Sequence, residues 1–215
     1  MMRKLLLVAV AAAAPIGLIA IAGTAGAAKS PPVNATTDTV TCTTISGSVK
    51  FSPAVTSSEK AGTAHTSIKA TVTGCTSNAV GLKVTSGKAA GTLTTTRTAG
   101  ENGCAALAGG SDATGPITTS WKTTPKLSSG DSVIHVNSIS GSIGSDGNAT
   151  FTIPGNVANG TPSGSFQGTN AGASDTTSAQ TTTSAASILA TCDGKKGLKG
   201  IDIKTPASGS AVNLG

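Results

Sequence analysis

The sequence predicts an all-β protein: an antiparallel β-sandwich of about eight or nine strands that follows an N-terminal signal helix. Three observations predict this class. Apolar residues alternate with polar ones at the two-residue spacing of strands, and turn residues separate these runs. After residue 27, no stretch keeps apolar residues at helical spacing over more than two turns. A jelly roll or a small barrel is the main alternative.

The first segment has the order of a secretory signal peptide. Arg3 and Lys4 precede an almost wholly apolar stretch, and Ala25-Gly26-Ala27 offers the small residues that signal peptidase requires. A transmembrane anchor is the alternative, because an apolar stretch of about 18 residues can span a bilayer. Pro15 and the absence of basic residues directly after the stretch favour cleavage. We expect residues 1–27 to be a signal peptide and the mature protein to be secreted, extracellular or cell-wall associated, without stable membrane insertion.

The rest of the chain predicts one domain. Residues 28–38 contain Pro31-Pro32 and read as an extended linker, and residues 39–215 have the length of a single β-sandwich domain. Within it, strand-like runs bounded by turn residues lie at 39–51, 66–75, 80–84, 91–96, 116–124, 132–140, 148–153, 164–169, 187–192 and 197–203.

Local features refine this order of strands. The apolar positions change parity between Cys42 and Ile45, which predicts a bulge near Thr43-Thr44. Asp146-Gly147 predicts a hairpin turn, because glycine tolerates the positive φ that such turns demand. The best candidate for a short helix is 104–110, CAALAGG. The threonine-rich stretch 170–187 is compatible with a loop or with a twisted edge strand.

The four cysteines, Cys42, Cys75, Cys104 and Cys192, predict two disulfides. An even number of cysteines in an exported protein is expected to oxidise. Their spacings of 33, 29 and 88 residues lack the close pairs of zinc or C-x-x-C redox sites, so we expect no metal and no other cofactor. Of the three possible pairings we favour Cys75 with Cys104 and Cys42 with Cys192, which would join a turn to the glycine-rich loop and the first strand to the last.

The composition argues against a nucleic-acid partner. Removal of Arg3 and Lys4 with the signal peptide leaves 13 basic against 9 acidic residues, and the one basic cluster lies at Lys195, Lys196 and Lys199 with Lys204. Single-stranded nucleic acids require aromatic platforms along a basic groove, whereas this chain has one Trp, three Phe and no Tyr.

Motifs for catalysis are weak. A serine hydrolase would have to use His65 or His135 beside a carboxylate and a serine, and the alternation of 132–136 directs His135 outward. The segment 109–113, GGSDA, is the nearest approach to a nucleophile elbow, and 57–60, SSEK, matches S-x-x-K without its companion motifs. Trp121 is expected in the core, with a sugar-binding platform as the alternative. We therefore predict no catalytic residues.

Six segments resemble a loose group of uncharacterised secreted proteins from high-GC Gram-positive bacteria: TCTTISGSVKFSPAV, TGCTS, NGCAALAGG, ITTSWKT, GSFQG and TCDGKKGLKGIDI. The resemblance implies an immunoglobulin-like sandwich, agrees with the favoured cysteine pairing and carries over no catalytic residues.

Together these features predict a secreted or cell-envelope-associated, non-enzymatic protein with a structural or binding role. Its partner would be an unidentified extracellular protein or glycan. A small secreted hydrolase and a carbohydrate-binding module are the alternatives.

Overall fold

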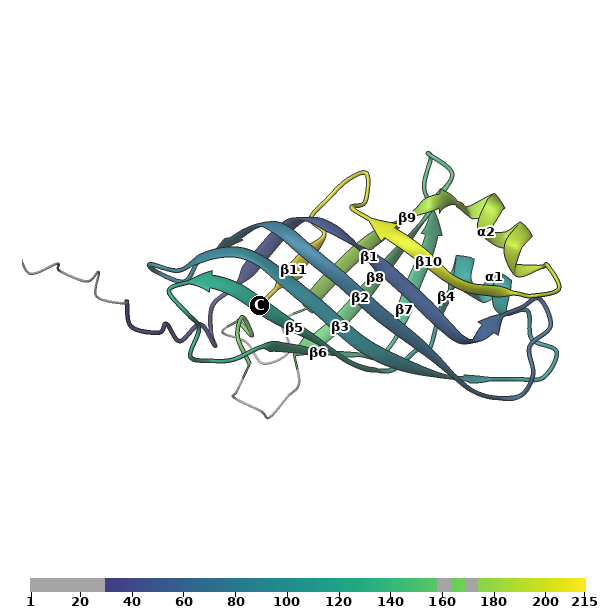
Figure 1. Cartoon of the computed structure of the whole chain (residues 1–215), viewed down its shortest axis with the longest axis horizontal. Helices are drawn as coiled ribbons and strands as arrows, with labels where there is room; N and C mark the ends of the chain where they lie inside the picture. Colours follow the sequence, from purple (N-terminus) through teal and green to yellow (C-terminus); the bar gives the residue numbers. More distant parts are fainter. Residues whose placement is uncertain (1–29, 158–163, 169–173) are drawn as a thin grey trace, which may run out of the picture.

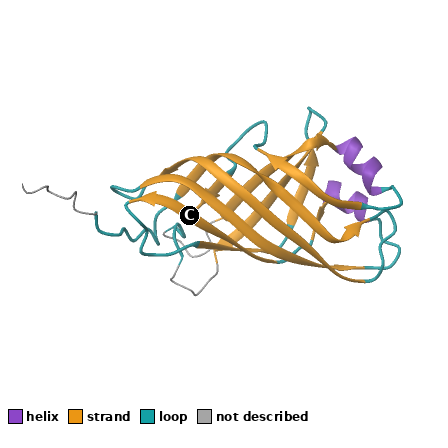
Figure 2. Ribbon diagram, viewed as in Figure 1, coloured by secondary structure: helices purple, strands orange, loops and turns teal. Residues whose placement is uncertain are grey.

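A computed structural model describes residues 30–157, 164–168 and 174–215 of the chain, so the expected signal peptide, residues 1–27, lies outside the described residues. The described part is all-β and antiparallel, as predicted (Figures 1 and 2). The strands are β1 Val40–Val55, β2 Gly62–Ser77, β3 Lys83–Arg97, β4 Gly110–Ser111, β5 Gly115–Thr124, β6 Ser132–Val136, β7 Ile139–Ile143, β8 Asn148–Val157, β9 Ser174–Ser184, β10 Leu198–Lys204 and β11 Val212–Leu214, and the helices are α1 Gly103–Gly109 and α2 Ala185–Cys192.

The described strands form one sheet that closes on itself. Pairing runs from β1 through β2, β3, β5, β6, β8 and β9, and both β10 and β11 then pair with β9 on one side and with β1 on the other. The expected immunoglobulin-like sandwich of eight or nine strands is not confirmed, because the eleven strands of the described residues belong to a single sheet, which closes on itself and which β7 and β4 extend from β8. This arrangement corresponds to the small-barrel alternative, in which closure leaves few open strand edges.

The two-residue alternation along the strands directs one face of the sheet inward. In β2, Ala64, Ile68, Ala70 and Val72 are buried, whereas residues between them, such as Lys69, are exposed. Because every second side chain points to the same face of a strand, the apolar positions of the ring line its interior. The polar positions, mostly Thr, Ser and Lys, cover the outside.

The bulge predicted near Thr43-Thr44 is wrong: burial changes parity there, but the register of the β1–β2 pair does not shift. Burial changes phase between Cys42 and Ile45 in β1, and it does so again between Val72 and Cys75 in the facing part of β2. The pairing is the same on both sides of this point. Both strands thus depart together from regular alternation, and Gly74 supplies the positive φ of 63°.

The ring has two different ends (Figure 1). One end, here called the helical end, carries α1, α2 and the β1–β2 loop, and the C-terminus lies away from it. At the opposite end Phe166 is fully buried, and its ring meets that of Trp121 edge to face at 5.3 Å. The Trp121 indole N–H donates to Ser132 Oγ at 2.8 Å, and that hydroxyl donates to the Ser165 carbonyl at 2.6 Å.

Residues from the expected linker 28–38 also lie at this opposite end. Ala35 is fully buried, and its carbonyl accepts a hydrogen bond from the Phe166 backbone N–H at 2.8 Å. Val33 forms an isolated bridge with Leu127. The hydrogen bond from Phe166 to Ala35 lies in a loop, where Phe166 has a positive φ of 58°. The strand that the sequence suggests for residues 164–169 is therefore not formed at Phe166. Together these contacts close the opposite end.

The stretch 170–187, for which a loop and an edge strand were both open, contains β9. This strand pairs on both sides, so it is neither a loop nor an edge. The expected strand 187–192 is wrong: these residues belong to α2. Ser184 begins the helix by accepting from the Ser187 backbone N–H, as helix-capping serines do. The predicted helix near Cys104 is confirmed as α1, and the turn at Asp146-Gly147 joins β7 to β8.

The hydrogen bonds of that turn also affect the Asp146 carboxylate. Asn148 donates to it from both its side chain and its backbone. These bonds, with smaller contributions from Gln180 and Lys204, lower the pKa of Asp146.

All four cysteines form disulfides, as predicted, but the favoured pairing is wrong. Cys42 bonds to Cys75, and Cys104 bonds to Cys192. Cys42 and Cys75 face each other across the β1–β2 pair, which places the two sulfurs within bonding reach. Cys104 lies on α1 and Cys192 on α2. Because Cys192 was expected on a strand, the sequence did not indicate that two helices meet here. Disulfides of this kind are typical of an oxidising compartment.

The two disulfides are predicted to differ in their effect on stability. The loops they close span 33 and 88 residues. Loop entropy predicts that loss of either disulfide lowers the free energy of unfolding by about 4 kcal/mol, and that loss of Cys104–Cys192 lowers it by about 1 kcal/mol more than loss of Cys42–Cys75. Denaturant unfolding of Cys42→Ala/Cys75→Ala and Cys104→Ala/Cys192→Ala variants measures the difference.

Peptide mapping without reduction should recover the same two pairs, and a peptide that links Cys75 to Cys104 would contradict the assignment.

Candidate binding cavity

The closed sheet encloses a cavity of about 670 Å³. Every strand of the ring contributes apolar side chains to its wall. The inner wall includes Ile45, Val49 and Phe51 of β1, Ile68, Ala70 and Val72 of β2, Ala89 of β3, Ile117 of β5, Ile134 of β6, Phe151 and Ile153 of β8, Ala179 of β9, Ile201 and Ile203 of β10, and Val212 of β11. This volume lies within the range of about 300–1,000 Å³ that is usual for small-molecule sites.

Small side chains leave the space in the middle of the ring. Ala70 faces Ala89 directly across the β2–β3 pair, and Ala179 lies on β9. Where a filled interior would place branched side chains, these positions supply one methyl group each. The buried apolar residues form three clusters instead of one continuous core. The cavity is thus a consequence of which residues point inward.

Polarity is distributed unequally along the cavity. In the middle of the wall, the polar groups of the described residues are the hydroxyls of Thr66, Thr119 and Thr177, and the other side chains are apolar. The charged residues that line it, Glu59, Arg97, Glu101 and Asp112, all come from the helical end. They lie on the β1–β2 loop, at the end of β3 and on the segment from residue 98 to 114 that connects β3 to β5.

A buried ion pair joins two of these elements. Arg97 Nη1 lies 2.6 Å from Glu59 Oε2, and the two side chains are only 11% and 5% exposed. Glu59 Oε1 also accepts from the Thr56 backbone N–H at 2.9 Å, and Arg97 donates to the carbonyls of Pro53 and Ala54. This network fixes the β1–β2 loop against the end of β3. The guanidinium charge is therefore already neutralised and hydrogen-bonded inside the protein.

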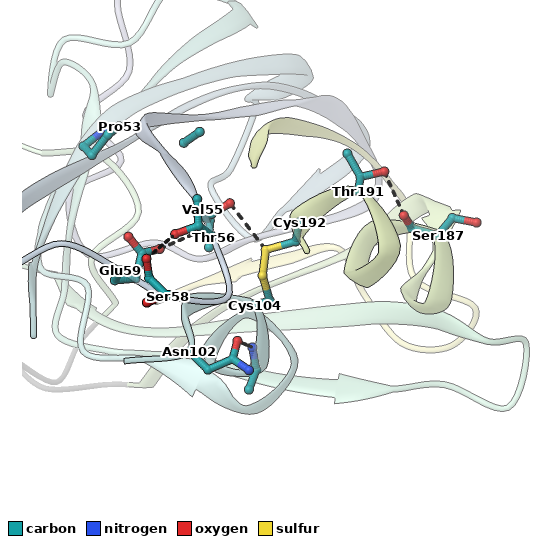
Figure 3. Close-up of a disulfide and its surroundings, with 12 residues drawn as sticks. Pro53, Val55, Thr56, Ser58, Glu59, Asn102, Cys104, Ser187, Thr191 and Cys192 are labelled. Atoms are coloured by element: carbon teal, nitrogen blue, oxygen red, sulfur yellow. Dashed lines mark hydrogen bonds between the residues drawn. A yellow bond between two sulfur atoms is a disulfide. The ribbon is translucent and has the colours of Figure 1, made fainter. Parts of the chain in front are cut away.

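The helix α1 covers part of the same end (Figure 3). Asn102 caps it by accepting from the Ala105 backbone N–H, and Cys104 joins it to α2. Cys192 Sγ lies 3.4 Å from the Val55 carbonyl oxygen, so the disulfide packs on the end of β1. Gly103 has no room for a side chain, because a Cβ there would collide with Glu59. Through Ala106 and Leu107, α1 forms a wall of the cavity.

The residues that the sequence singled out for chemistry do not form a site. His65 and His135 are both exposed on the outside of the sheet, as expected for His135, and the one ion pair of the described residues is Arg97–Glu59, so neither histidine is paired with a carboxylate. Trp121 is half-buried against the core, and both its ring and its N–H have partners inside the protein. Its ring is not an open sugar platform.

The two weak motifs acquire different roles. In 57–60, Glu59 has a structural role, because it forms the ion pair with Arg97. In 109–113, Asp112 is exposed and lines the end of the cavity. Within the described part of the chain, no three His, Cys, Asp or Glu side chains are grouped to hold a metal ion. Neither of the helices described there has the length and apolarity needed to cross a membrane.

Comparisons with protein-family models, with curated proteins and with solved structures find no match for this chain.

Composition holds the one signal that points to the charged end of the cavity. Arg97 is the only arginine after residue 3, and Glu59 and Glu101 are the only glutamates in the chain. The other charged residues are lysines and aspartates. The three rare side chains lie at one place in the fold, although 38 residues separate Glu59 from Arg97 in the sequence. Sequence reasoning that attended to motifs alone missed them.

Substitution of Glu59 by Gln should destabilise the protein by about 3 kcal/mol, because it leaves the buried Arg97 charge without its counter-ion. Glutamine keeps an oxygen for the Thr56 N–H, so the change isolates the charge. Urea unfolding measures the effect.

Glu101→Gln is the matched control for this variant, since the Glu101 side chain is exposed; its expected effect is within about 0.5 kcal/mol. The double variant Glu59→Gln/Arg97→Met should recover part of the loss. Equal effects of Glu59→Gln and Glu101→Gln would show that the ion pair contributes nothing particular to stability.

Proposed function

We propose that this chain is an exported, non-enzymatic binding protein that holds the apolar part of a small lipophilic molecule inside its closed sheet. The observation that carries the proposal is the apolar cavity, whose mid-section presents aliphatic, aromatic and threonine side chains without a charged group. An apolar ligand that enters it exchanges water for this wall, and each buried methylene contributes about 0.8 kcal/mol.

The geometry supports entry at the helical end. The opposite end is closed by Phe166, Trp121 and the hydrogen bonds of Ser132. The polar and charged lining residues gather at the helical end, where a ligand's polar group would remain near water. The apolar part would therefore enter first and lie along the axis of the ring.

Export and the lack of catalysis belong to the same proposal. The signal-like sequence of residues 1–27 and the two disulfides support export to an oxidising compartment. A holding function needs shape and apolar surface and no arrangement of acid, base and nucleophile.

Two neighbouring alanines provide the test. Ala89 lines the cavity, whereas Ala90 is exposed on the outside of the same strand. Ala89→Phe should weaken binding of a neutral fluorescent probe such as N-phenyl-naphthylamine by about tenfold or more, because the ring occupies the space that the probe needs. Ala90→Phe adds the same ring outside and should bind the probe as the unsubstituted protein does.

Titration of probe fluorescence measures both affinities, and thermal unfolding followed by circular dichroism verifies that each variant is folded. The single tryptophan offers a second readout, by energy transfer to the bound probe. Equal binding by the two folded variants, or no binding by the unsubstituted protein, would refute the proposal.

A series of linear alcohols tests it without any substitution. Displacement of the probe should strengthen about fourfold for each added methylene, as burial of one methylene predicts, and should level off once the cavity is filled. A flat series would indicate binding on the outer surface.

A further inference from the structure

We infer that the charged residues at the helical end select the head group of the ligand: the cavity takes single-chain amphiphiles whose head is neutral or cationic in preference to those with a carboxylate head. The inference rests on the proposed function, since it names the class of ligand for the same cavity.

The position of the head group follows from the cavity's asymmetry. The closed end is filled by the packed rings of Trp121 and Phe166, and the middle of the wall has no charged group. A charged or strongly polar head cannot be buried there without a partner except at a large cost. It therefore lies at the helical end, among Glu59, Arg97, Glu101 and Asp112.

The charge that a head group meets there is negative. Among the residues that the structure describes, Arg97 is the only cation that lines the cavity, and its guanidinium is bound by Glu59 at 2.6 Å and by two backbone carbonyls. Glu59 and Arg97 thus cancel each other, and Glu101 and Asp112 leave two uncompensated carboxylates. Lys60, Lys195 and Lys196, on loops at the same end, are exposed and do not line the cavity.

This charge balance acts oppositely on different head groups. A carboxylate head would be repelled by Glu101 and Asp112, and it could reach the Arg97 charge only by displacing Glu59, which would leave Glu59 buried without its counter-ion. An alcohol can donate a hydrogen bond to either carboxylate, and an ammonium is attracted by both. The apolar wall of the cavity does not distinguish the carboxylate, the alcohol and the ammonium, because the three ligands carry the same alkyl chain.

The experiment uses the full chain and three ligands that share one chain length: hexadecanol, hexadecyltrimethylammonium and hexadecanoate, each kept below the concentration at which it aggregates. Displacement of the neutral probe at low ionic strength ranks their affinities. The alcohol and the ammonium should bind about tenfold more tightly than the carboxylate. The advantage of the ammonium should shrink at about 0.5 M salt, where the Debye length falls to about 4 Å.

Two variants locate the effect. Glu101→Gln/Asp112→Asn should strengthen hexadecanoate binding relative to hexadecanol by several-fold. Asp193→Asn/Asp202→Asn removes the same charge from exposed positions outside the cavity lining and should leave the ranking as it is.

Carboxylate binding as tight as that of the alcohol, or an equal effect of the two double variants, would overturn the inference while the cavity function stands. Failure of the unsubstituted protein to bind the neutral probe would instead remove the proposed function and this inference with it.

Discussion

Closure of the sheet is the constraint on which the other features of this molecule depend. Because β1 pairs with β2 on one side and with β10 and β11 on the other, the inward side chains of every strand face one enclosed volume. In an open sheet, a helix or a second layer would cover these side chains. Here they can contact only one another across the ring, so their sizes decide how much space remains. Ala70, Ala89 and Ala179 contribute only one methyl group each to the wall of this volume.

The two covalent links join β1 to β2 and α1 to α2. Cys42–Cys75 joins two strands next to the point at which both depart from regular alternation. Cys104–Cys192 holds α1 and α2 together over the helical end, where Glu59 and Arg97 fix the β1–β2 loop. A protein with a hollow interior gives up part of the burial energy that stabilises a filled core. Crosslinks that reduce the entropy of the unfolded chain offset part of that loss.

Sequence patterns predicted the local structure well where one strand or one turn determines it. Alternation indicated which residues share a face, Asp146-Gly147 indicated its hairpin, and the cysteine count indicated two disulfides. Partners could not be predicted in the same way, since the period of a strand says nothing of which strand lies beside it. The choice between a sandwich and a closed sheet, the pairing of Cys104 with Cys192, and the meeting of Glu59 with Arg97 all depend on such partners. The helix α2 was missed because Ile188, Leu189 and Thr191 suit a strand as well, and the Ser184 cap decides between the two.

The central claim is that the ring holds an apolar space that a ligand can occupy, and diffraction from crystals grown with a long-chain alkyl bromide tests it most directly. The account predicts an anomalous bromine peak inside the ring, on its axis between Ala70, Ala89 and Ala179. An interior filled by the protein's own side chains, with bromine found only on the outer surface, would contradict it.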